Sequence, residues 1–593
     1  MPLSLRHQLG IGLVAGFVFF THLGTPALWD RDEPRNAGCA EQMWKQGEWI
    51  VPTFNGELRA HKPALLYWFM MSAYSVFGPG EFAARFWSAA FGVGTCLLTY
   101  QIGRRLFSAH AGVWAALALA TSLNFGIVAR AATPDSVYIF FSTAALAVFA
   151  FGVVTQCEVR APRILEVNRR TLAAAYVLMG IAVLAKGPIG VLLPGFAQFL
   201  FLLYAPLPRM DDAGGHRSRW QALVARLGAP WRPGNVAAVL WSQQPLLAIA
   251  IVGAIALPWY VAVGARTEGS FLATFFGEHN VGRFVRPMEG HSGPIFYYLI
   301  AVLVGFFPWS CFAGSMCAGW WQRVKAGGPE RMAAIFVACW AGAYLGFFSL
   351  AGTKLPSYVL PAYPALALIA GAFLKGLLAG RFDARRYWAP VSFACLAFVG
   401  LGLVIGAVVV VQRYLPGEWA LVGIGVAPLA AGLASLWLLQ QNRLPSALGS
   451  FAAGAVLLAV GVLGFGAARV DQHQVSRPLM AQLRAKGAAG ASLGAFGALE
   501  PSWVYYSGRA ISWLQTAEQM AAFLRVEETP YVITTTAQLE LLPGGLPPGL
   551  AVLAHTPQFL RPGDLVIVGR ASELARWSAP SEVLQAELPT SRR

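Results

Sequence analysis

Long hydrophobic runs separated by short polar loops extend from the N-terminus to about residue 468. A helix that crosses a bilayer needs about 20 mostly apolar residues. The pattern predicts thirteen spanning helices, over residues 8–28, 84–103, 111–131, 135–154, 171–186, 188–205, 244–264, 294–318, 331–351, 357–379, 388–412, 418–440 and 446–468. No small-residue cleavage site follows the first run, so we interpret it as a retained span rather than a signal peptide.

The chain after residue 468 has a different pattern. Short β-rich runs at 502–506, 531–534 and 564–568 alternate with helix-like pieces such as 516–526. Strands that alternate with helices are typical of an α/β domain. The sequence therefore predicts an α-helical polytopic membrane core over residues 1–468 and a small α/β domain over residues 469–593.

The composition agrees with a membrane protein. The 593 residues are 56% hydrophobic and only 12% charged, whereas soluble domains carry about 25% charged residues. The net charge of +16 lies in loops, and no nucleic-acid-binding pattern accompanies it, so we exclude nucleic acid as a partner. The seven cysteines are scattered and predict neither a disulfide framework nor a metal cluster.

Basic residues predict the orientation, because loops rich in Lys and Arg stay in the cytoplasm. They occupy alternate loops, which places residues 29–83, 265–293 and 469–593 on the non-cytoplasmic side of the membrane. The basic loop residues are Arg104, Arg105, Arg160, Arg163, Arg169, Arg170, Arg209, Arg217, Arg219, Arg226, Arg232, Arg323, Lys325, Arg331, Arg381, Arg385 and Arg386.

A charged cluster follows the first predicted span directly. Asp32, Glu33 and Arg35 stand there within apolar and aromatic sequence. Such a cluster could be a solvated cap at the membrane surface, but ionisable groups at that depth are costly and often functional. A carboxylate held by neighbouring cations stays ionised, as a base or a metal ligand must. We expect a functional site.

Three more charged residues lie beside apolar spans. Asp135 begins a span, where it could complement the helix dipole or face the first loop. Lys186 and Lys354 lie in short turns, where they could extend to the interface or bind an anionic head group, since lysine acts as a point charge for phosphate. No acid adjoins either lysine in the sequence, which favours an anionic ligand.

A further outer loop contains Glu278, His279 and Arg283. One histidine and one or two carboxylates could hold a divalent cation, although the spacing of these residues does not define a metal site. All the chemically suggestive residues fall on the predicted non-cytoplasmic face, so we expect them to form one site. They are Asp32, Glu33, Arg35, Lys62, Asp135, Lys186, His279, Arg283, Lys354 and Tyr358.

Taken together, these residues resemble aminoarabinose transferases and related bacterial glycosyltransferases that use polyprenyl-phosphate sugars. They belong to the C-type glycosyltransferase superfamily, which also contains the protein O-mannosyltransferases. The resemblance covers about residues 8–365. It rests on Asp32-Glu33-Pro34-Arg35, Trp49-Ile50-Val51-Pro52, Lys62-Pro63 with Leu66-Tyr67-Trp68, Pro134-Asp135, Lys186-Gly187-Pro188, Glu278-His279 with Arg283-Phe284, and Lys354-Leu355 with Tyr358 and Pro361.

The resemblance implies a C-type glycosyltransferase fold with a periplasmic cavity. It also implies that the enzyme transfers a sugar from undecaprenyl phosphate to lipid A or another periplasmic acceptor. One candidate for the sugar is 4-amino-4-deoxy-L-arabinose. The resemblance further implies a multi-pass protein of the bacterial inner membrane, surrounded by membrane lipids, with its active site and its C-terminal domain facing the periplasm. The implied catalytic residues are Asp32, Asp135 and Glu33. The implied ligands of the lipid phosphate or substrate are Arg35, Lys62, Lys186, Arg283, Lys354 and Tyr358, and those of a divalent metal ion are His279 and His61.

Two positions depart from the family pattern. Aminoarabinose transferases tend to have an acid where this chain has His61, so a metal there would be held by imidazole. They also tend to have an aromatic residue where this chain has Asn36. The role of Asp32 stays open at this point: a hydroxyl acceptor needs a general base, whereas a lipid A phosphate is already largely ionised.

A transporter or flippase of polyprenyl-linked glycans is the alternative from another functional class. A transporter would carry ionisable residues inside its spans, along a path through the membrane. Here these residues gather at one predicted face, and the sequence therefore favours the enzyme.

Overall fold

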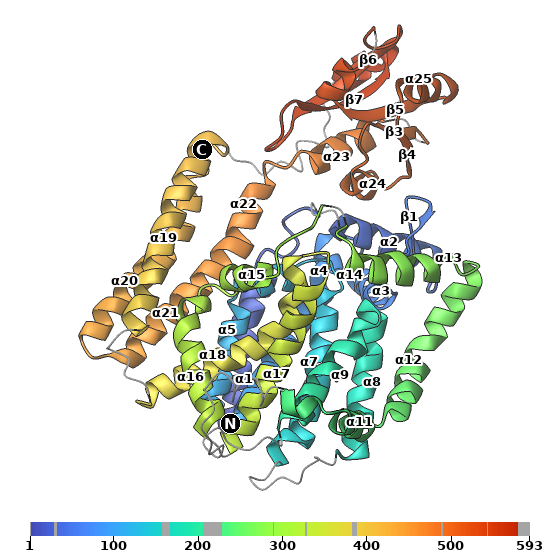
Figure 1. Cartoon of the computed structure of the whole chain (residues 1–593). Coiled ribbons are helices and arrows are strands. Elements are labelled where there is room, and N and C mark those ends of the chain that lie inside the picture. Colours follow the sequence, from blue (N-terminus) through green and yellow to red (C-terminus); the bar gives the residue numbers. More distant parts are fainter. Residues whose placement is uncertain are drawn as a thin grey trace.

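The computed structural model describes residues 2–28, 32–156, 167–205, 228–288, 290–326, 329–381, 388–487, 490–542 and 544–578. Most of this chain is helical, and a small sheet lies at one end of the helical part (Figure 1). Among the described residues, eight helical stretches are long and apolar enough to cross a membrane: Leu3–Phe20, Asp135–Gly152, Pro245–Arg266, Glu330–Leu350, Pro356–Leu378, Trp388–Arg413, Trp419–Gln440 and Leu444–Asp471. The protein is a multi-pass membrane protein.

Two bent helix pairs would raise the number of spans to ten. Ala109–Ala120 and Leu123–Ala129 meet at 69°, and Tyr297–Gly305 and Trp309–Lys325 meet at 115°. The thirteen predicted spans are therefore not confirmed. The predicted spans 84–103, 171–186 and 188–205 correspond to helices α4, α8 and α9. Helix α9 has only 16 residues, and α4 and α8 carry charged residues that lower their hydropathy.

The N-terminal half of the chain is built from these elements: α1 (Leu3–Phe20), α2 (Asp32–Gln46), β1 (Thr53–Phe54), β2 (Glu57–Leu58), α3 (Leu65–Phe77), α4 (Glu81–Leu106), α5 (Ala109–Ala120), α6 (Leu123–Ala129), α7 (Asp135–Gly152), α8 (Arg169–Lys186), α9 (Ile189–Tyr204), α11 (Pro233–Ser242), α12 (Pro245–Arg266), α13 (Ser270–Leu272), the π-helix η4 (Ala273–Gly282) and α14 (Arg283–Val285).

The second half continues with α15 (Tyr297–Gly305), α16 (Ala313–Ala326), α17 (Pro329–Leu350), the 3₁₀-helix η6 (Pro356–Ala362), α18 (Tyr363–Leu378), α19 (Trp388–Arg413), α20 (Val422–Gln440), α21 (Leu444–Val460), the π-helix η8 (Gly461–Gly466) and α22 (Ala467–Asp471). It ends with α23 (Ser476–Lys486), β3 (Ser492–Phe496), α24 (Pro501–Ser507), β4 (Ile511–Leu514), α25 (Ala517–Val526), β5 (Pro530–Thr535), α26 (Thr536–Glu540), β6 (Leu550–Pro557), β7 (Asp564–Arg570) and α27 (Leu574–Ser578).

The membrane core packs closely where small residues face each other. A Cβ atom on Gly371 of α18 would lie 2.2 Å from the carbonyl oxygen of Ala111 in α5. Gly103 of α4 approaches Gly112 of α5 in the same way, at 2.7 Å. Small residues let membrane helices approach closely and gain van der Waals contact. Helices α19 and α20 instead form a hairpin that stands to one side of this core (Figure 1).

The C-terminal α/β segment, which we define as residues 476–578, contains a five-stranded sheet of order β4-β3-β5-β7-β6. Strands β4, β3 and β5 are parallel, and β7 is antiparallel to both β5 and β6. The predicted β-rich runs 531–534 and 564–568 lie in β5 and β7, and the predicted helix 516–526 corresponds to α25. Residues 579–593 of the predicted domain lie outside the described residues.

The β-rich run predicted at 502–506 is wrong, because these residues form helix α24. Pro501 occupies the first helical position, where proline is favoured because its fixed φ suits a helix and its missing N–H costs nothing. Gly508, with φ of 69°, ends the helix in the left-handed conformation. These two flanking residues outweigh the β propensity of the aromatic residues between them.

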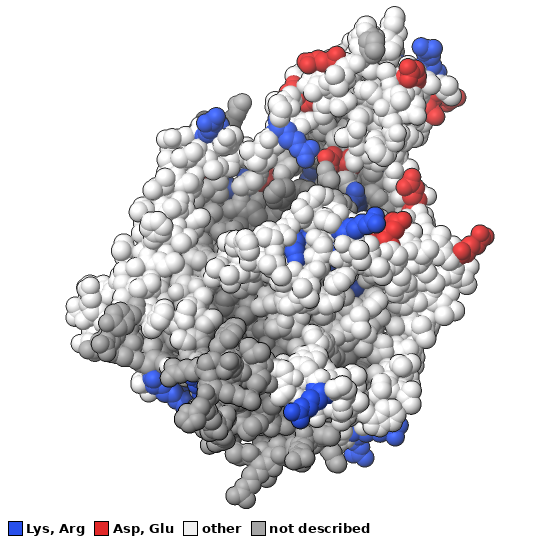
Figure 2. Space-filling model, viewed as in Figure 1, with Lys and Arg blue, Asp and Glu red and all other residues white. Residues whose placement is uncertain are grey.

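Charged side chains lie at the two ends of the helical part, with a largely uncharged band between them (Figure 2). In this view the acidic side chains gather at the end that carries the first loop and the C-terminal α/β segment. This distribution suits a bilayer around the uncharged band, whereas the predicted orientation stays a prediction. Several basic residues that predict it lie outside the described residues: Arg160, Arg163, Arg209, Arg217, Arg219, Arg226, Arg385 and Arg386.

Candidate active site

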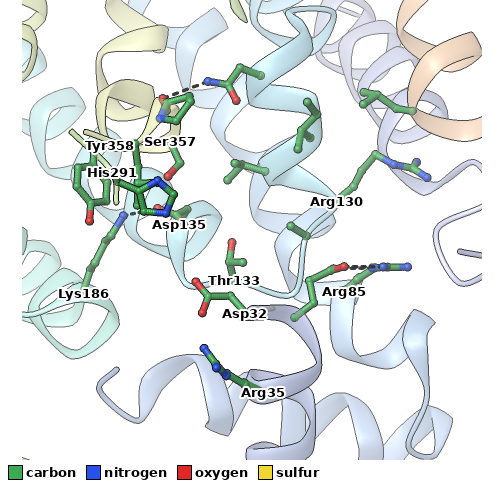
Figure 3. A pocket seen from close by; sticks show the side chains of 18 of the residues that line it. Asp32, Arg35, Arg85, Arg130, Thr133, Asp135, Lys186, His291, Ser357 and Tyr358 are labelled. Carbon is green, nitrogen blue, oxygen red and sulfur yellow. Dashed lines mark hydrogen bonds and ion pairs between the residues drawn. The ribbon is translucent and has the colours of Figure 1, made fainter. Parts of the chain in front are cut away.

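A cavity of about 1680 Å³ lies where the first loop meets the membrane core. Its volume exceeds the ~300–1,000 Å³ of typical small-molecule pockets, so it has room for more than a single sugar. Figure 3 shows part of its polar wall. The polar and charged residues that line it are Asp32, Glu33, Arg35, His61, Lys62, Arg85, Asn124, Arg130, Thr133, Asp135, Lys186, His279, Asn280, Arg283, His291, Ser357 and Tyr358.

Asp32 is the first residue of helix α2 and lies between Arg35 and Thr133 on the cavity wall (Figure 3). Burial alone would favour the protonated acid. Four surrounding cations outweigh burial and hold the pKa of Asp32 below its usual value; in order of effect they are Lys62, Arg59, Arg35 and Arg283. The site therefore keeps an ionised carboxylate within a cationic surrounding.

Arg59 and Asn36 fix the first loop behind Asp32. Arg59 is buried; its Nη2 donates to Oδ1 of Asn36 at 2.9 Å and its Nε to the hydroxyl of Tyr67 at 3.2 Å. The amide of Asn36 donates to the carbonyl oxygen of Ala132 at 3.0 Å. An aromatic residue at position 36 could not make both bonds. Asn36 thus helps to hold Arg59 close to Asp32.

Glu33 is engaged by protein groups. Its two oxygens accept from Nε and Nη2 of Arg85 at 2.8 and 2.7 Å, and Oε1 also accepts from the backbone N–H of Ala132 at 2.9 Å. Both side chains are buried. A paired, hydrogen-bonded carboxylate of this kind joins α2, α4 and the turn before α7, so the geometry favours a structural role for Glu33 over the catalytic one expected from the sequence.

Asp135 and Lys186 form an ion pair across the cavity (Figure 3). Asp135 is the first residue of α7, and Lys186 is the last residue of α8. Gly187 then ends α8 with φ of 76°, and a Cβ atom there would lie 2.7 Å from the ring of Phe275, so only glycine suits this turn. No acid adjoins Lys186 in the sequence, but folding brings Asp135 to it from 51 positions away.

Tyr358 and Arg283 complete the cationic wall. Nη1 of Arg283 donates to the hydroxyl of Tyr358 at 3.3 Å. The ammonium of Lys186 lies 5.5 Å from the centroid of the Tyr358 ring and at the same distance from that of Tyr138. Lys62 lines the same cavity, within electrostatic range of Lys186 and Arg283. Three cations from separate parts of the chain thus gather at one wall, where they can bind a phosphate.

Lys354, expected at the phosphate, is not among the cavity-lining residues. It is buried, and its ammonium donates to the carbonyl oxygens of Phe348 and Ser349 at 3.0 and 2.6 Å. These carbonyls belong to the last turn of α17, whose final C=O groups lack partners within the helix. Lys354 therefore caps α17, and the prediction that it holds a phosphate is not supported by its position.

The two histidines expected to bind a metal ion lie face to face. The ring centroids of His61 and His279 are 4.1 Å apart, with 32° between the ring planes. Burial, and then the charge of Arg59, lowers the pKa of His61 to about 3, so its ring is neutral at pH 7. Within the part of the chain that the structure describes, no group of three or more His, Cys, Asp or Glu side chains is arranged to hold a metal ion. We derive no step through one.

The opposite wall of the cavity is apolar. Helices α19 and α20, η8 and α22 supply it, half with small residues and half with Leu, Val and Ile, and Leu23 and Ile127 also line it. The small members are Gly402, Gly406, Ala407, Gly425, Gly466 and Ala467. We call this wall the apolar lobe. A cavity that joins a cationic wall to an apolar lobe suits a ligand with an anionic head group and a hydrocarbon chain.

Four residues at or beside the site were not predicted from the sequence, namely Arg59, Arg85, Arg130 and Thr133. Arg85 and Arg130 are buried. Each lies next to an apolar run in the sequence, and an ionisable residue in such a position indicates a functional or structural role. Arg130 donates to the carbonyl oxygens of Val18 and Phe19, at 3.1 and 2.9 Å. The hydroxyl of Thr133 is buried beside Asp32 without a hydrogen-bond partner in the described chain, and is available to a substrate.

Comparison with known proteins gives consistent results. The family model described as dolichyl-phosphate-mannose-protein mannosyltransferase matches residues 61–210. The undecaprenyl phosphate-alpha-4-amino-4-deoxy-L-arabinose arabinosyl transferase of Edwardsiella ictaluri (strain 93-146) is 29% identical over 377 residues, which are 63% of this chain and 60% of that protein. The chain thus matches less than two thirds of that relative's length.

Transferase 1 of the same description from Sodalis glossinidius (strain morsitans) is 31% identical over 445 residues, which are 72% of this chain and 70% of that protein. The crystal structure of ArnT from Cupriavidus metallidurans bound to undecaprenyl phosphate superposes with a TM-score of 0.71 at 22% identity. The superposition covers 97% of this chain and 99% of that one. The chain therefore has the C-type glycosyltransferase fold of that protein.

Proposed function

Because the chain belongs to the family of undecaprenyl phosphate-alpha-4-amino-4-deoxy-L-arabinose arabinosyl transferases, we propose that it moves 4-amino-4-deoxy-L-arabinose from undecaprenyl phosphate to lipid A. The observation that carries the proposal is the setting of Asp32: an ionised carboxylate among four cations, in a cavity whose other wall is the apolar lobe. The cationic wall suits the lipid phosphate and the apolar lobe suits lipid chains.

In the transfer reaction, an oxygen of the acceptor attacks the anomeric carbon of the sugar. The bond from that carbon to the donor phosphate breaks, and its electron pair leaves with undecaprenyl phosphate. Positioned cations stabilise the charge that develops on the leaving phosphate. We assign this role to Lys62, Arg283 and Lys186, and hydrogen bonding to the same phosphate to Tyr358.

The role of Asp32 follows from the acceptor. A lipid A phosphate is mostly ionised at pH 7, because its second pKa lies near 6, so its oxygen attacks without a base. Asp32 then orients the sugar, together with the unpartnered hydroxyl of Thr133. With a hydroxyl acceptor, the same ionised carboxylate takes the proton as a general base.

Transfer should be measured with the purified protein in lipid nanodiscs, given undecaprenyl-phosphate-linked aminoarabinose and lipid A. We expect lipid A that carries the added sugar, detected by mass spectrometry, and free undecaprenyl phosphate in equal amount. The same protein in vesicles tests the transporter alternative. Movement of an unchanged donor lipid across the vesicle membrane, with no sugar transferred, would contradict the proposal.

The divalent metal stays a prediction with its own test. Removal of metal ions by a chelator, followed by gel filtration, should lower transfer if His61 and His279 hold a metal ion, and the ion that restores transfer identifies the metal. The periplasmic position of the cavity and of the C-terminal α/β segment likewise stays a prediction, and it is tested below by reporter fusions.

A further inference from the structure

The short segment from Leu23 to Leu28, which leads from α1 toward Asp32, is held by side chains distant in sequence. Arg85 donates to the carbonyl oxygens of Leu23, Pro26 and Ala27 at 3.1, 2.5 and 2.9 Å. The same guanidinium is paired with Glu33 at 2.7 Å, directly after Asp32. The carbonyl groups of this segment are therefore fixed from the α4 side.

The backbone N–H groups of the segment are fixed from the C-terminal part of the chain. Ala27 donates to Oδ1 of Asp471 at 2.8 Å, and Leu28 donates to the hydroxyl of Tyr506 at 2.6 Å. Both donors belong to buried residues. Asp471 is the last residue of α22, and Tyr506 lies in α24, which packs against α2.

Tyr506 uses both hydrogen-bonding capacities of its hydroxyl. It accepts from Leu28 and donates to Oε1 of Glu81 at 3.1 Å, and Glu81 also pairs with Arg477 at 3.5 Å. The neighbouring Tyr505 lies against Gly38 of α2, but its hydroxyl has no hydrogen bond among the described residues. The two adjacent tyrosines thus differ in the hydrogen bonds of the hydroxyl group, which is the group that a change to phenylalanine removes.

The position of this segment is coupled to that of Asp32 through Arg85. One guanidinium binds both the carbonyl groups of the segment and Glu33, so a displacement of the segment is passed on to the start of α2. The segment also borders the cavity through Leu23 and Pro26, and α22 borders it through Ala467 and Val470. The hydrogen bonds from Asp471 and Tyr506 therefore lie at the wall of the candidate active site.

We propose that Tyr506 and Asp471 are positioning residues of the transfer reaction. They hold the backbone of Leu28 and Ala27 so that Asp32 stays among its cations. The C-terminal α/β segment then acts on the reaction through α24, although none of its described residues lines the cavity. This inference rests on the proposed function, since it assigns residues that act through Asp32.

The test compares Tyr506→Phe with Tyr505→Phe in the full-length protein. Each change removes one hydroxyl and keeps the ring. For Tyr506→Phe we expect kcat to fall about tenfold, because a buried N–H loses its acceptor and the segment shifts, while the KM for the donor changes less than about twofold. For Tyr505→Phe we expect both constants to stay within about twofold. Equal kcat values for the two variants would overturn the inference.

A pH profile separates positioning from a general loss of folded protein. If Asp32 moves away from its cations, its pKa rises, so the acid limb of kcat/KM moves to higher pH in Tyr506→Phe. A loss of folded protein lowers the whole profile without moving the limb, and that result would overturn the inference.

Asp471 provides a second pair of variants that keeps the inference testable if Tyr506→Phe folds poorly. Asp471→Asn retains an oxygen that can accept from Ala27, whereas Asp471→Ala does not. We expect Asn to retain most of the activity and Ala to lose it. Equal activities would contradict the inference. If the parent protein transfers no sugar at all, the proposed function fails instead.

Discussion

The two lysines that the sequence placed at the phosphate, Lys186 and Lys354, have different roles in the structure. Lys186 lines the cavity and forms an ion pair with Asp135, which lines it too. Lys354 instead donates hydrogen bonds to two carbonyl groups at the end of α17. Both lysines follow apolar runs and look alike in sequence. The direction of each ammonium group determines whether it can bind a ligand in the cavity.

Replacement of each lysine by methionine should therefore have different results. Methionine keeps the apolar stem and removes the charge. We expect Lys186→Met to weaken binding of undecaprenyl phosphate about tenfold or more, because the phosphate loses a charge-assisted hydrogen bond. Lys354→Met should lower the melting temperature and leave that Kd within about twofold. Binding measured by microscale thermophoresis distinguishes them, and equal Kd values would contradict the assignment.

His61 gives a prediction about pH. Its folded pKa of about 3 lies below the ordinary value of 6.5, so the unfolded chain binds a proton that the folded chain does not. Stability therefore falls as the pH drops from about 6.5 toward 3. Asp32, whose pKa is also lowered, adds to this loss only below its unfolded value of 3.8.

We expect the melting temperature of the parent protein to fall more between pH 7.5 and pH 5 than that of His61→Gln, which cannot titrate. His291→Gln, at an exposed histidine of the same cavity, is the matched control and should behave like the parent. The same pH dependence in the parent and in His61→Gln would show that His61 is not held neutral.

The sequence predicted single residues better than their pairing. A charged residue beside an apolar span is energetically costly and is therefore often functional. This rule identified Asp32, Asp135 and Lys186 from the sequence. The ion pair of Asp135 with Lys186 could not, since the two residues are 51 positions apart. The capping role of Lys354 likewise depends on where α17 ends, and that boundary is set by packing.

At the scale of elements, the α19–α20 hairpin forms one side of the apolar lobe. Gly402 and Gly406 of α19 line it, and a Cβ atom at either position would meet no other atom within 4 Å. Glycine is an unfavourable residue inside a helix, by about 1 kcal/mol relative to alanine. Its use here is consistent with a wall that must stay open to a ligand.

Gly406→Leu fills this space without a clash, so the protein should fold and its helix should gain propensity. We expect the KM for one of the two lipid substrates to rise about tenfold, which also identifies the lipid that occupies the lobe. Gly423→Leu in α20 is the matched control, because it is equally unobstructed and does not line the cavity. Unchanged KM values for both lipids in Gly406→Leu would contradict this use of the lobe.

At the scale of the whole molecule, the uncharged band between two charged ends indicates how the protein lies in a bilayer (Figure 2). Three predicted spans, at α4, α8 and α9, are not confirmed by the length and hydropathy of the described helices. These helices combine apolar runs with charged residues, or are short. Sequence hydropathy counts apolar residues whether they face lipid or another helix, and cannot separate the two.

The predicted orientation places the cavity and the C-terminal α/β segment in the periplasm. A reporter fused after Arg232 should be active as a cytoplasmic reporter, and one fused after Arg593 as a periplasmic reporter. This outcome follows from the excess of Lys and Arg in the cytoplasmic loops. The same compartment for both fusions would contradict the orientation.

The role of Asp32 as the central acid of the active site is tested by sugar transfer with Asp32→Asn, measured beside the parent and Glu48→Gln. Asn keeps the shape of the side chain and removes its charge. We expect transfer to fall about 100-fold or more, with melting temperature and undecaprenyl phosphate binding retained. Glu48→Gln removes a carboxylate of the same loop that pairs with the half-exposed Arg266, and it should transfer sugar like the parent. If Asp32→Asn retains half of the parent's activity, Asp32 only begins helix α2 and the proposed active site is wrong.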